Sequence, residues 1–185
     1  KYLYKYPQGR FPYEQLITAN RERSKDEGEF ELIDTGSFDE DRYFDVFVEY
    51  AKADTDDILI KITAENRGPD DAQIHVLPTA WFRNKWVWNG SDPDRGMWST
   101  RKGVIEMECG PLGKRFLHCE GAGELLFTEN ETNNERLFGT ANRTAYVKDG
   151  INDHVVGGRP DTVNPNRTGT KASAHYIMEV AAGDS

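Results

Sequence analysis

Alternating apolar and polar side chains dominate the pattern of this chain and predict β-strands. In residues 58–62, isoleucine takes every second position, and from Lys61 to Glu65 the intervening positions are polar. Residues 43–50 alternate in the same way but carry aromatic and aliphatic side chains on both faces. Residues 52–57 lie between these segments and are dense in turn-forming Asp and Thr. Together the three segments predict a β-hairpin.

Further short strands are predicted at regular intervals, separated by turn signals. They cover residues 2–6, 29–34, 73–84, 103–109, 114–120, 124–128 and 174–180. Pro78 cannot donate to a strand ladder, so the strand around it is expected to bulge or to lie at an edge. A short helix is expected from Pro12 to about Ser24, and a helical turn near residues 148–156. We therefore predict an all-β, mainly antiparallel fold over residues 1–185: a single domain, a large two-sheet β-sandwich with one or two short helices.

The segment from 130 to 170 breaks this rhythm and is predicted to be an ordered surface that packs against another domain. Long irregular excursions inside a compact domain are usually functional or support a neighbour. This one carries more apolar side chains than a solvated linker needs, and they must be buried against the sandwich or against another domain. They are Leu137, Phe138, Tyr146, Val147, Ile151, Val155 and Val156.

The net charge and composition make two classes of binding partner improbable. A formal charge of -9 and a pI near 5.0 repel phosphate backbones and anionic lipids, so neither nucleic acid nor a membrane is expected as a partner. The start of the chain has no apolar signal core, and no apolar run approaches the length of a membrane span. The hairpin register keeps Cys109 and Cys119 apart, so both thiols should be free. We expect a cytoplasmic protein and, because both ends look cut, a piece of a larger polypeptide.

All four tryptophans, Trp81, Trp86, Trp88 and Trp98, fall within one short stretch of the chain. Indole faces stack on the apolar faces of sugar rings, so a tryptophan cluster in loops is a candidate carbohydrate platform. A core cluster or an interdomain surface explains the same composition. The sequence leaves these alternatives open.

Two glutamates, Glu129 and Glu131, lie on one face of an extended segment, roughly 6.5 to 7 Å apart from the strand rise alone. That separation suits the acid and base of an inverting glycosidase, and the two glutamates are also candidate substrate-binding residues. Adjacent exposed acids are also common in so acidic a chain. The acidic runs 39–41 and 92–94 lack the pattern of a calcium loop and are predicted to be solvated turns. No metal site or cofactor is expected.

Several longer phrases resemble the bacterial proteins akin to glycoside hydrolase family 63. They are KYLYKYPQ at residues 1–8, FDEDRYFDV at 38–46, LFTENETN at 126–133, ERLFG at 135–139, NP at 164–165 and GTKA at 169–172. The resemblance implies a supersandwich of the galactose mutarotase type that precedes an (α/α)6 barrel. Family 63 includes α-glucosidases that hydrolyse with inversion, and their catalytic carboxylates belong to the barrel.

The resemblance therefore implies no catalytic residue in this chain. It implies a non-catalytic N-terminal sandwich domain that packs on its own C-terminal catalytic barrel and shapes the active-site rim, with an oligosaccharide as a further partner. One alternative is an independent carbohydrate-binding module that uses the tryptophans. Another is a mutarotase-like sugar enzyme, in which His75 would act with Glu129 or Glu131.

Overall fold

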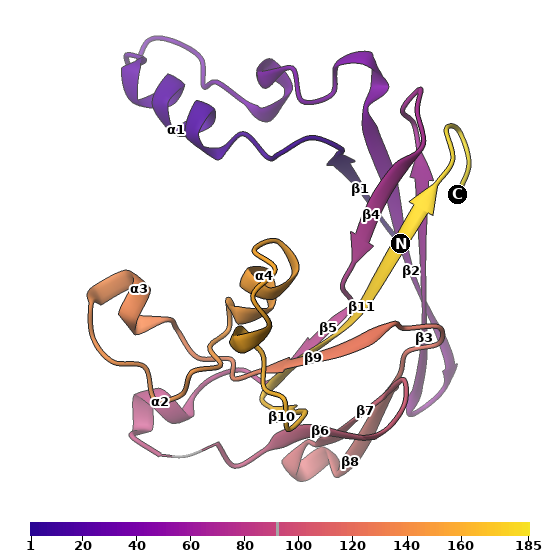
Figure 1. Ribbon diagram of the computed structural model, residues 1–185, viewed down its shortest axis with the longest axis vertical. Coiled ribbons are helices and arrows are strands. Elements are labelled where there is room, and N and C mark those ends of the chain that lie inside the picture. The colour runs from indigo at the N-terminus through magenta and orange to yellow at the C-terminus, as the bar shows by residue number, and fades with distance from the viewer. Residues whose placement is uncertain (92) are drawn as a thin grey trace. The chain divides into compact units, whose positions relative to one another are not determined.

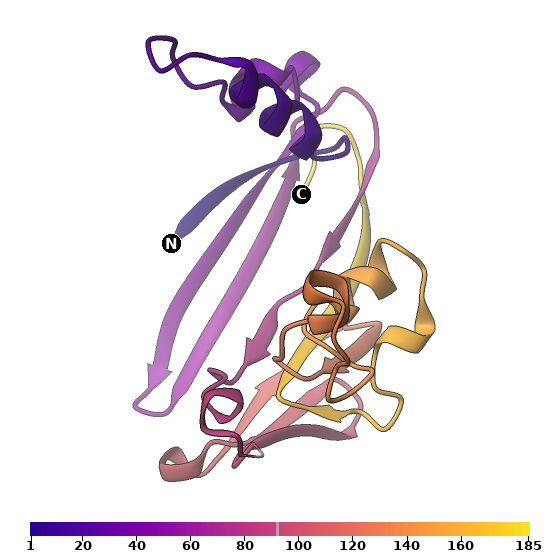
Figure 2. The same cartoon turned by 90° about the vertical axis from the view of Figure 1, so that its left-hand side faces the viewer.

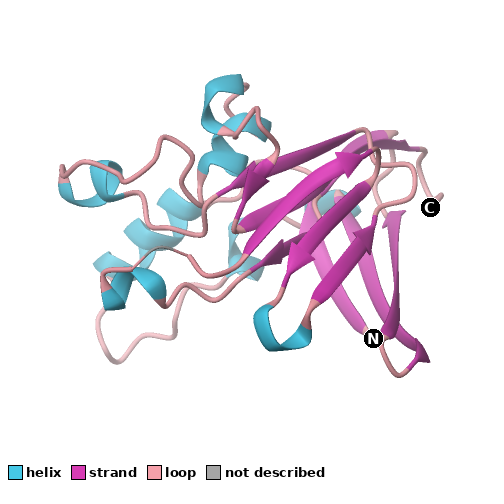
Figure 3. Ribbon diagram, turned by 90° about the horizontal axis from the view of Figure 1, so that it is seen from below, coloured by secondary structure: helices cyan, strands magenta, loops and turns pink. Residues whose placement is uncertain are grey.

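The computed structural model describes residues 1–91 and 93–185, which are mostly antiparallel β-structure with short helices (Figures 1 and 3). Strands make up 38% of the chain and helices 21%, so the predicted all-β, mainly antiparallel class is confirmed, and the content is consistent with a β-sandwich. The strands form three sheets. The backbone divides into two compact units, residues 1–74 with 178–185, and residues 75–177. Each unit is described separately below.

The first unit is built on a three-stranded antiparallel sheet in the order β1-β2-β3. Its register places Tyr4 opposite Val46, and Val46 opposite Ala64. The helix predicted from Pro12 is present, and it lies with two short 3-10 turns at one end of the sheet (Figure 2). The elements are β1 (Tyr2–Pro7), α1 (Tyr13–Glu22), η1 (Leu32–Thr35), η2 (Asp39–Asp41), β2 (Tyr43–Asp54) and β3 (Asp57–Asn66).

The strand predicted over residues 29–34 is wrong, because the chain forms the 3-10 turn η1 there. The Asp34 carboxylate accepts a hydrogen bond from the Glu31 backbone N–H at 2.9 Å, and the Glu31 side chain caps the turn in return. Gly36 then ends the turn with a left-handed φ of 75°. Local capping by side chains thus outweighs the alternating pattern of this short segment.

The second unit holds a sheet in the order β10-β6-β7-β8, and a sheet in which β11 pairs with β5 and β9. The strands β4 (Ala72–Val76) and β11 (Lys171–Val180) each continue from one unit into the other. The remaining elements are β5 (Thr79–Trp81), α2 (Trp86–Asn89), β6 (Gly96–Arg101), β7 (Val104–Glu108), η3 (Gly110–Leu112), β8 (Lys114–His118), β9 (Glu124–Thr128), α3 (Asn134–Phe138), α4 (Gly150–Val155), η4 (Pro160–Thr162) and β10 (Thr168–Gly169).

Two local predictions hold in this unit. The strand around Pro78 is interrupted, since β4 ends at Val76 and β5 begins at Thr79. The hairpin of β7 and β8 places Val104 opposite His118, and both Cys109 and Cys119 are free thiols. Burial raises the pKa of the Cys119 thiol.

The core of the second unit forms where β9 and β11 meet β6, β7 and the start of α2. Leu125, Leu126 and Phe127 of β9 are all buried, as expected for a strand that is covered on both faces. The core cluster contains Phe82, Trp86, Met97, Ile105, Cys119, Ala122, Leu125, Phe127, Ala172 and Ala174. This core fixes the end of β9, from which the candidate site extends.

Candidate functional site

The segment 128–131 begins with the last residue of β9, and several distant loops are hydrogen-bonded to it. The Glu129 N–H donates to the Tyr146 carbonyl at 2.8 Å, and the Lys148 N–H donates to the Glu131 carbonyl at 2.9 Å. On the other side, the Thr170 N–H donates to the Thr128 carbonyl at 3.1 Å. Segments far apart in the sequence are therefore tied to one short piece of backbone. We call residues 128–131 the hub.

Side chains complete the hub. Thr170 Oγ1 donates to Glu129 Oε2 at 2.6 Å and accepts from the Asn130 N–H at 2.8 Å. Asn130 Nδ2 donates to the Phe82 carbonyl at 2.9 Å, while Asn84 Nδ2 donates to the Asn130 carbonyl at the same distance. Buried polar groups are costly unless they are paired. The side chains of Glu129 and Asn130 are paired, whereas the buried Thr128 hydroxyl has no hydrogen-bond partner among the described residues.

Glu131 joins the hub to helix α2. Its side chain is buried at 6% exposure, and its Oε1 accepts the indole N–H of Trp86 at 2.8 Å. Arg143 Nη1 approaches the same oxygen at 3.5 Å and supplies a compensating positive charge. The carboxylate therefore holds the tryptophan in place. Any effect of Glu131 on a ligand would pass through residues that it positions.

Helix α3 is held by side-chain contacts at each end. Asn133 Oδ1 caps its first turn by accepting from the Arg136 N–H at 3.0 Å, and Gly139 ends it with φ 67°. The Arg136 guanidinium binds Asp149 at 2.6 Å and Asp153 at 2.5 Å, which links α3 to α4. These contacts, the hydrogen bond to Asp153 first, raise the pKa of Arg136. We define residues 129–170 as the loop layer. Contacts between its own residues hold α3 against α4.

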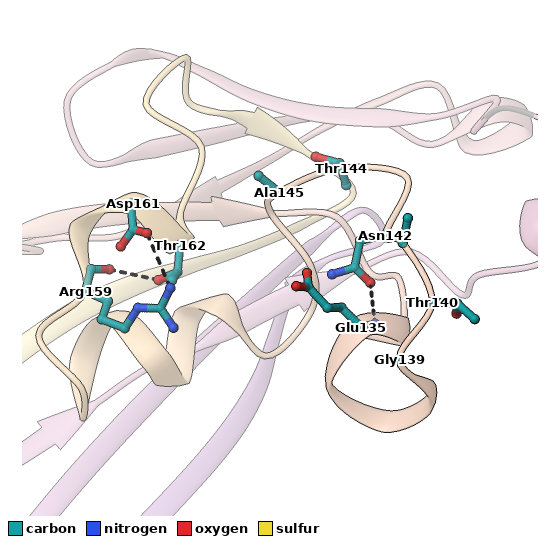
Figure 4. Close-up of a pocket in the computed structure, with 10 residues that line it drawn as sticks. Glu135, Gly139, Thr140, Asn142, Thr144, Ala145, Arg159, Asp161 and Thr162 are labelled. Carbon is teal, nitrogen blue, oxygen red and sulfur yellow. Dashed lines mark hydrogen bonds and ion pairs between the residues drawn. The ribbon is translucent and has the colours of Figure 1, made fainter.

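A polar pocket of about 620 Å³ opens inside the loop layer (Figure 4). One wall is Glu135 of α3 with the loop that follows it, and the other is Arg159 with η4. Figure 4 shows the Glu135 carboxylate and the Arg159 guanidinium directed into the space between these walls. The lining consists of Glu135, Gly139, Thr140, Ala141, Asn142, Thr144, Ala145, Arg159, Asp161 and Thr162.

The structure separates the four tryptophans proposed as a sugar platform. Trp86 is buried in the core cluster, and Trp98 on β6 is half-buried. Trp81 on β5 and Trp88 on α2 are exposed. Trp86 also lines a second pocket of about 510 Å³ with Arg83, Lys85, Asn89, Ser91, Asp94 and Arg95. The exposed pair, Trp81 and Trp88, offers indole faces to a ligand, whereas Trp86 serves first as a core residue.

The apolar residues predicted to face another domain also divide into groups. Val147 and Ile151 are buried within the chain, and Tyr146 and Val155 are half-buried. Three of these residues are exposed: Leu137 and Phe138 on α3, and Val156 just after α4. The candidate docking surface is therefore this smaller set of three residues on α3 and just after α4.

Sequence reasoning missed a histidine cluster on β4, β9, β11 and α4. His75 Nδ1 and His175 Nε2 lie 2.9 Å apart, and Glu124 Oε2 lies 4.0 Å from His175 Nδ1 and 3.3 Å from His154 Nε2. Burial, followed by the nearby His75, lowers the pKa of His175. These four residues are widely separated in the sequence, and only strand pairing brings them together.

Within residues 1–91 and 93–185, no group of three or more His, Cys, Asp or Glu side chains could hold a metal ion. The acidic run 39–41 forms the turn η2, and Asp92 of the run 92–94 lies outside the described residues. Among the described helices, none is long and apolar enough to cross a membrane.

Comparison with known proteins gives one informative similarity. The chain is 32% identical over 212 residues to an uncharacterized protein of Saccharomyces cerevisiae, YMR196W, and the alignment covers 95% of the chain. The chain spans about a fifth of the length of that relative, at 20%. No family model matches the chain. No solved structure matches it either.

Proposed function

We propose that this chain is the non-catalytic N-terminal β-sandwich region of a glucosidase-like glycoside hydrolase akin to family 63. In this proposal the complete polypeptide hydrolyses α-glucosides with inversion, and its catalytic carboxylates lie in an (α/α)6 barrel outside residues 1–185. The sandwich packs on the barrel and shapes the rim of its active site. The phrases that resemble family 63, among them the hub and the start of α3, support this assignment.

One observation carries the proposal: contacts within the loop layer hold it in place, while two of its large apolar side chains, Leu137 and Phe138, remain exposed. Arg136 and Asn133 fix α3, yet Leu137 and Phe138 remain exposed. A helix held so firmly with apolar residues on its free side is typical of a docking surface. The yeast relative supports the same idea, because most of its length lies outside the aligned region.

The hub acids support a non-catalytic role for this chain. An inverting pair needs two carboxyl groups that face a water between them. Glu129 Oε2 instead accepts from Thr170, and Glu131 Oε1 accepts from Trp86. Both carboxylates therefore act as structural acceptors in this fold.

The proposal is tested by comparing this chain with the complete polypeptide encoded by its reading frame. Both are incubated with nitrophenyl α-glucoside and with α-linked gluco-disaccharides, and glucose release is followed by NMR, which also identifies the anomer formed first. We expect no release by the chain alone and release of β-glucose by the complete polypeptide. Turnover by the purified chain, or none by the complete polypeptide, contradicts the proposal.

The docking surface is tested with a matched pair of substitutions in both proteins. Leu137, at 61% exposure on α3, and Leu112, at 65% exposure on η3, are similarly accessible leucines in short helical turns. Leu137→Asp should lower the activity and the thermal stability of the complete polypeptide and leave the chain alone unchanged. Leu112→Asp should change neither. Hydrogen exchange should show residues 137–156 gaining protection only in the complete polypeptide, and equal protection in both proteins contradicts docking.

A second candidate function is an independent carbohydrate-binding module. The exposed indoles of Trp81 and Trp88 favour it. Titration of the chain with gluco-oligosaccharides, followed by tryptophan fluorescence, distinguishes this function from the first, since only a module needs tight binding without the barrel. The mutarotase-like alternative is weaker, because His75 contacts His175 near Glu124 rather than Glu129 or Glu131.

A further inference from the structure

We propose that the polar pocket between α3 and η4 binds one neutral sugar unit of an oligosaccharide, with Glu135 and Arg159 as its principal polar contacts. This inference rests on the proposed function, because it names the ligand class that the loop layer would present beside a glycosidase active site. None of the residues expected from the sequence to contact sugar lies in this pocket.

The pocket walls are held in place without any ligand. Asn142 Oδ1 accepts from the N–H groups of Asn134 at 2.7 Å and Glu135 at 3.2 Å, so the loop after α3 folds back on the helix. Opposite, the Thr162 hydroxyl donates to the Gly150 carbonyl at 2.8 Å. A Cβ at Gly150 would lie 2.2 Å from the Thr162 carbonyl oxygen, so only glycine allows η4 to approach α4 this closely. A preformed pocket of this kind lowers the entropic cost of binding.

The polar groups in the pocket complement sugar hydroxyls. Within residues 1–91 and 93–185, no hydrogen bond or ion pair to the Glu135 carboxylate is found, so both of its oxygens can accept from a ligand. Arg159 holds Asp161 at 3.3 Å and Asp153 at 3.9 Å, and a guanidinium has five N–H donors in all. A carboxylate accepts only and a guanidinium donates only, whereas a sugar hydroxyl does both. Neighbouring hydroxyls can therefore bridge the two walls.

Charge and size exclude the other obvious ligand classes. Glu135 and Asp161 against Arg159 leave the lining one formal negative charge, which disfavours phosphates and carboxylates. The lining has no aromatic residue and only alanines as apolar side chains, so an apolar ligand would gain little. A volume of about 620 Å³ lies within the usual range of roughly 300–1,000 Å³ for small-molecule sites. A neutral polyhydroxylated ligand fits the charge, the polar lining and the volume of the pocket.

The experiment follows amide chemical shifts of the chain during titration with methyl α-glucoside and with maltose. We expect shifts at residues 135–145 and 159–162. Glu135→Gln should weaken binding about tenfold or more, since a hydrogen bond to a charged acceptor is replaced by a neutral one. Ala141→Trp should abolish binding by filling the pocket while leaving every polar group in place. Glu120→Gln, at an exposed carboxylate outside the pocket, is the matched control and should bind as the parent chain does.

The outcomes separate this inference from the proposed function. Thermal unfolding of each variant first establishes that it is folded, which is expected because Glu135 and Ala141 are exposed. Absence of binding at millimolar sugar overturns the pocket assignment, as does binding that survives Glu135→Gln and Ala141→Trp but is lost in Trp88→Ala. Hydrolysis by the complete polypeptide would still support the proposed function in either case. Sugar binding that depends on Glu135, without hydrolysis by the complete polypeptide, supports the pocket and contradicts the glycosidase proposal.

Discussion

Two runs of three apolar residues behave in opposite ways in this molecule. Residues 58–60 of β3 (ILI) are exposed, whereas residues 125–127 of β9 (LLF) are buried. Both runs lie in regular antiparallel strands, so strand formation alone does not bury a side chain. The run in β9 continues into the hub, where three distant segments hold it. The run in β3 lies near the turn at residues 55–56, and among the strands that the structure describes it pairs with β2 alone.

The comparison shows what an apolar run does and does not predict. An apolar, β-branched run predicts a strand because such side chains fit a pleated surface. The run is buried only where other segments of the chain pack on it. In β9 the hydrophobic core cluster covers Leu125 and Phe127, and the polar residues Asn130 and Glu131 tie the segment that follows β9 to its neighbours.

The largest expected effect is on the free energy of unfolding, and it differs between the two apolar runs. Phe127, at 1% exposure, belongs to the core cluster, while Ile60 is 44% exposed. Phe127→Ala should lower the free energy of unfolding by about 3–5 kcal/mol, through lost burial and a residual cavity. Ile60→Ala should cost about 1 kcal/mol or less. Urea unfolding followed by circular dichroism measures both, and equal losses would contradict the distinction.

The hub is tested next by removing its buried carboxylate. Glu131→Ala leaves the buried Trp86 N–H without its acceptor, which should cost about 1–3 kcal/mol. Tryptophan emission should also shift to the red as α2 loosens. Glu120→Ala, at an exposed glutamate, should change the free energy of unfolding by less than about 0.5 kcal/mol. If Glu131→Ala were equally neutral, the hub would not be what holds β9 in place.

The sequence predicted the strands better than it predicted their surroundings. Residues 58–66, 104–118 and 124–128 carry the alternation and turn residues that define strands locally, and each is a strand or hairpin in the structure. The alternation in residues 29–34 predicts a strand, but reciprocal capping by Glu31 and Asp34 favours a 3-10 turn. The strand β6 is not among the strands predicted from the sequence.

The site was harder to predict because its contacts join distant residues. The polar partners of the hub, among them Asn84, Trp86, Arg143 and Thr170, lie 12 to 46 residues away along the chain from the groups they bind. His75 and His175 are separated by 100 positions. No spacing rule relates such residues. Glu129 and Glu131 lie on one short segment, and their partners Thr170 and Trp86 give them a structural role.

A smaller effect is expected from pH through His175, which β4, β9 and α4 surround with His75, Glu124 and His154. Burial, then the nearby His75, lowers its pKa in the folded state below the ordinary 6.5. The unfolded chain therefore binds this proton at a higher pH than the folded chain does. The stabilisation is complete above about pH 6.5 and is lost as the pH falls below that value, by up to about 1.4 kcal/mol per unit.

Urea unfolding between pH 7.5 and 5 measures this slope. His175→Gln should flatten it, because the group that titrates is gone. His118→Gln, on the exposed side of β8, should keep the slope of the parent chain. An unchanged slope in His175→Gln would assign the pH dependence to another group.

The smallest expected effect compares two arginines that each bridge two acids. Arg136 joins Asp149 and Asp153 in the loop layer, and Arg42 joins Glu40 and Asp70 in the other unit. Their side chains are similarly exposed, at 47% and 44%. The acids differ, because Asp149 and Asp153 are largely covered whereas Glu40 and Asp70 are open to solvent.

Exposed ion pairs contribute about 0–1 kcal/mol. Removing one partner costs more when the charge left behind is covered from solvent. We therefore expect Arg136→Gln to lower the free energy of unfolding by about 0.5–1 kcal/mol, and Arg42→Gln to lower it by less. Hydrogen exchange offers the sharper measurement: Arg136→Gln should speed exchange in residues 133–156, since the link between α3 and α4 is cut, while Arg42→Gln leaves those residues unchanged. High salt should weaken the Arg42 contacts more, because solvent ions reach them. Equal exchange in the two variants would mean that Asn133 and the hub alone hold α3, and that the order of the loop layer does not depend on Arg136.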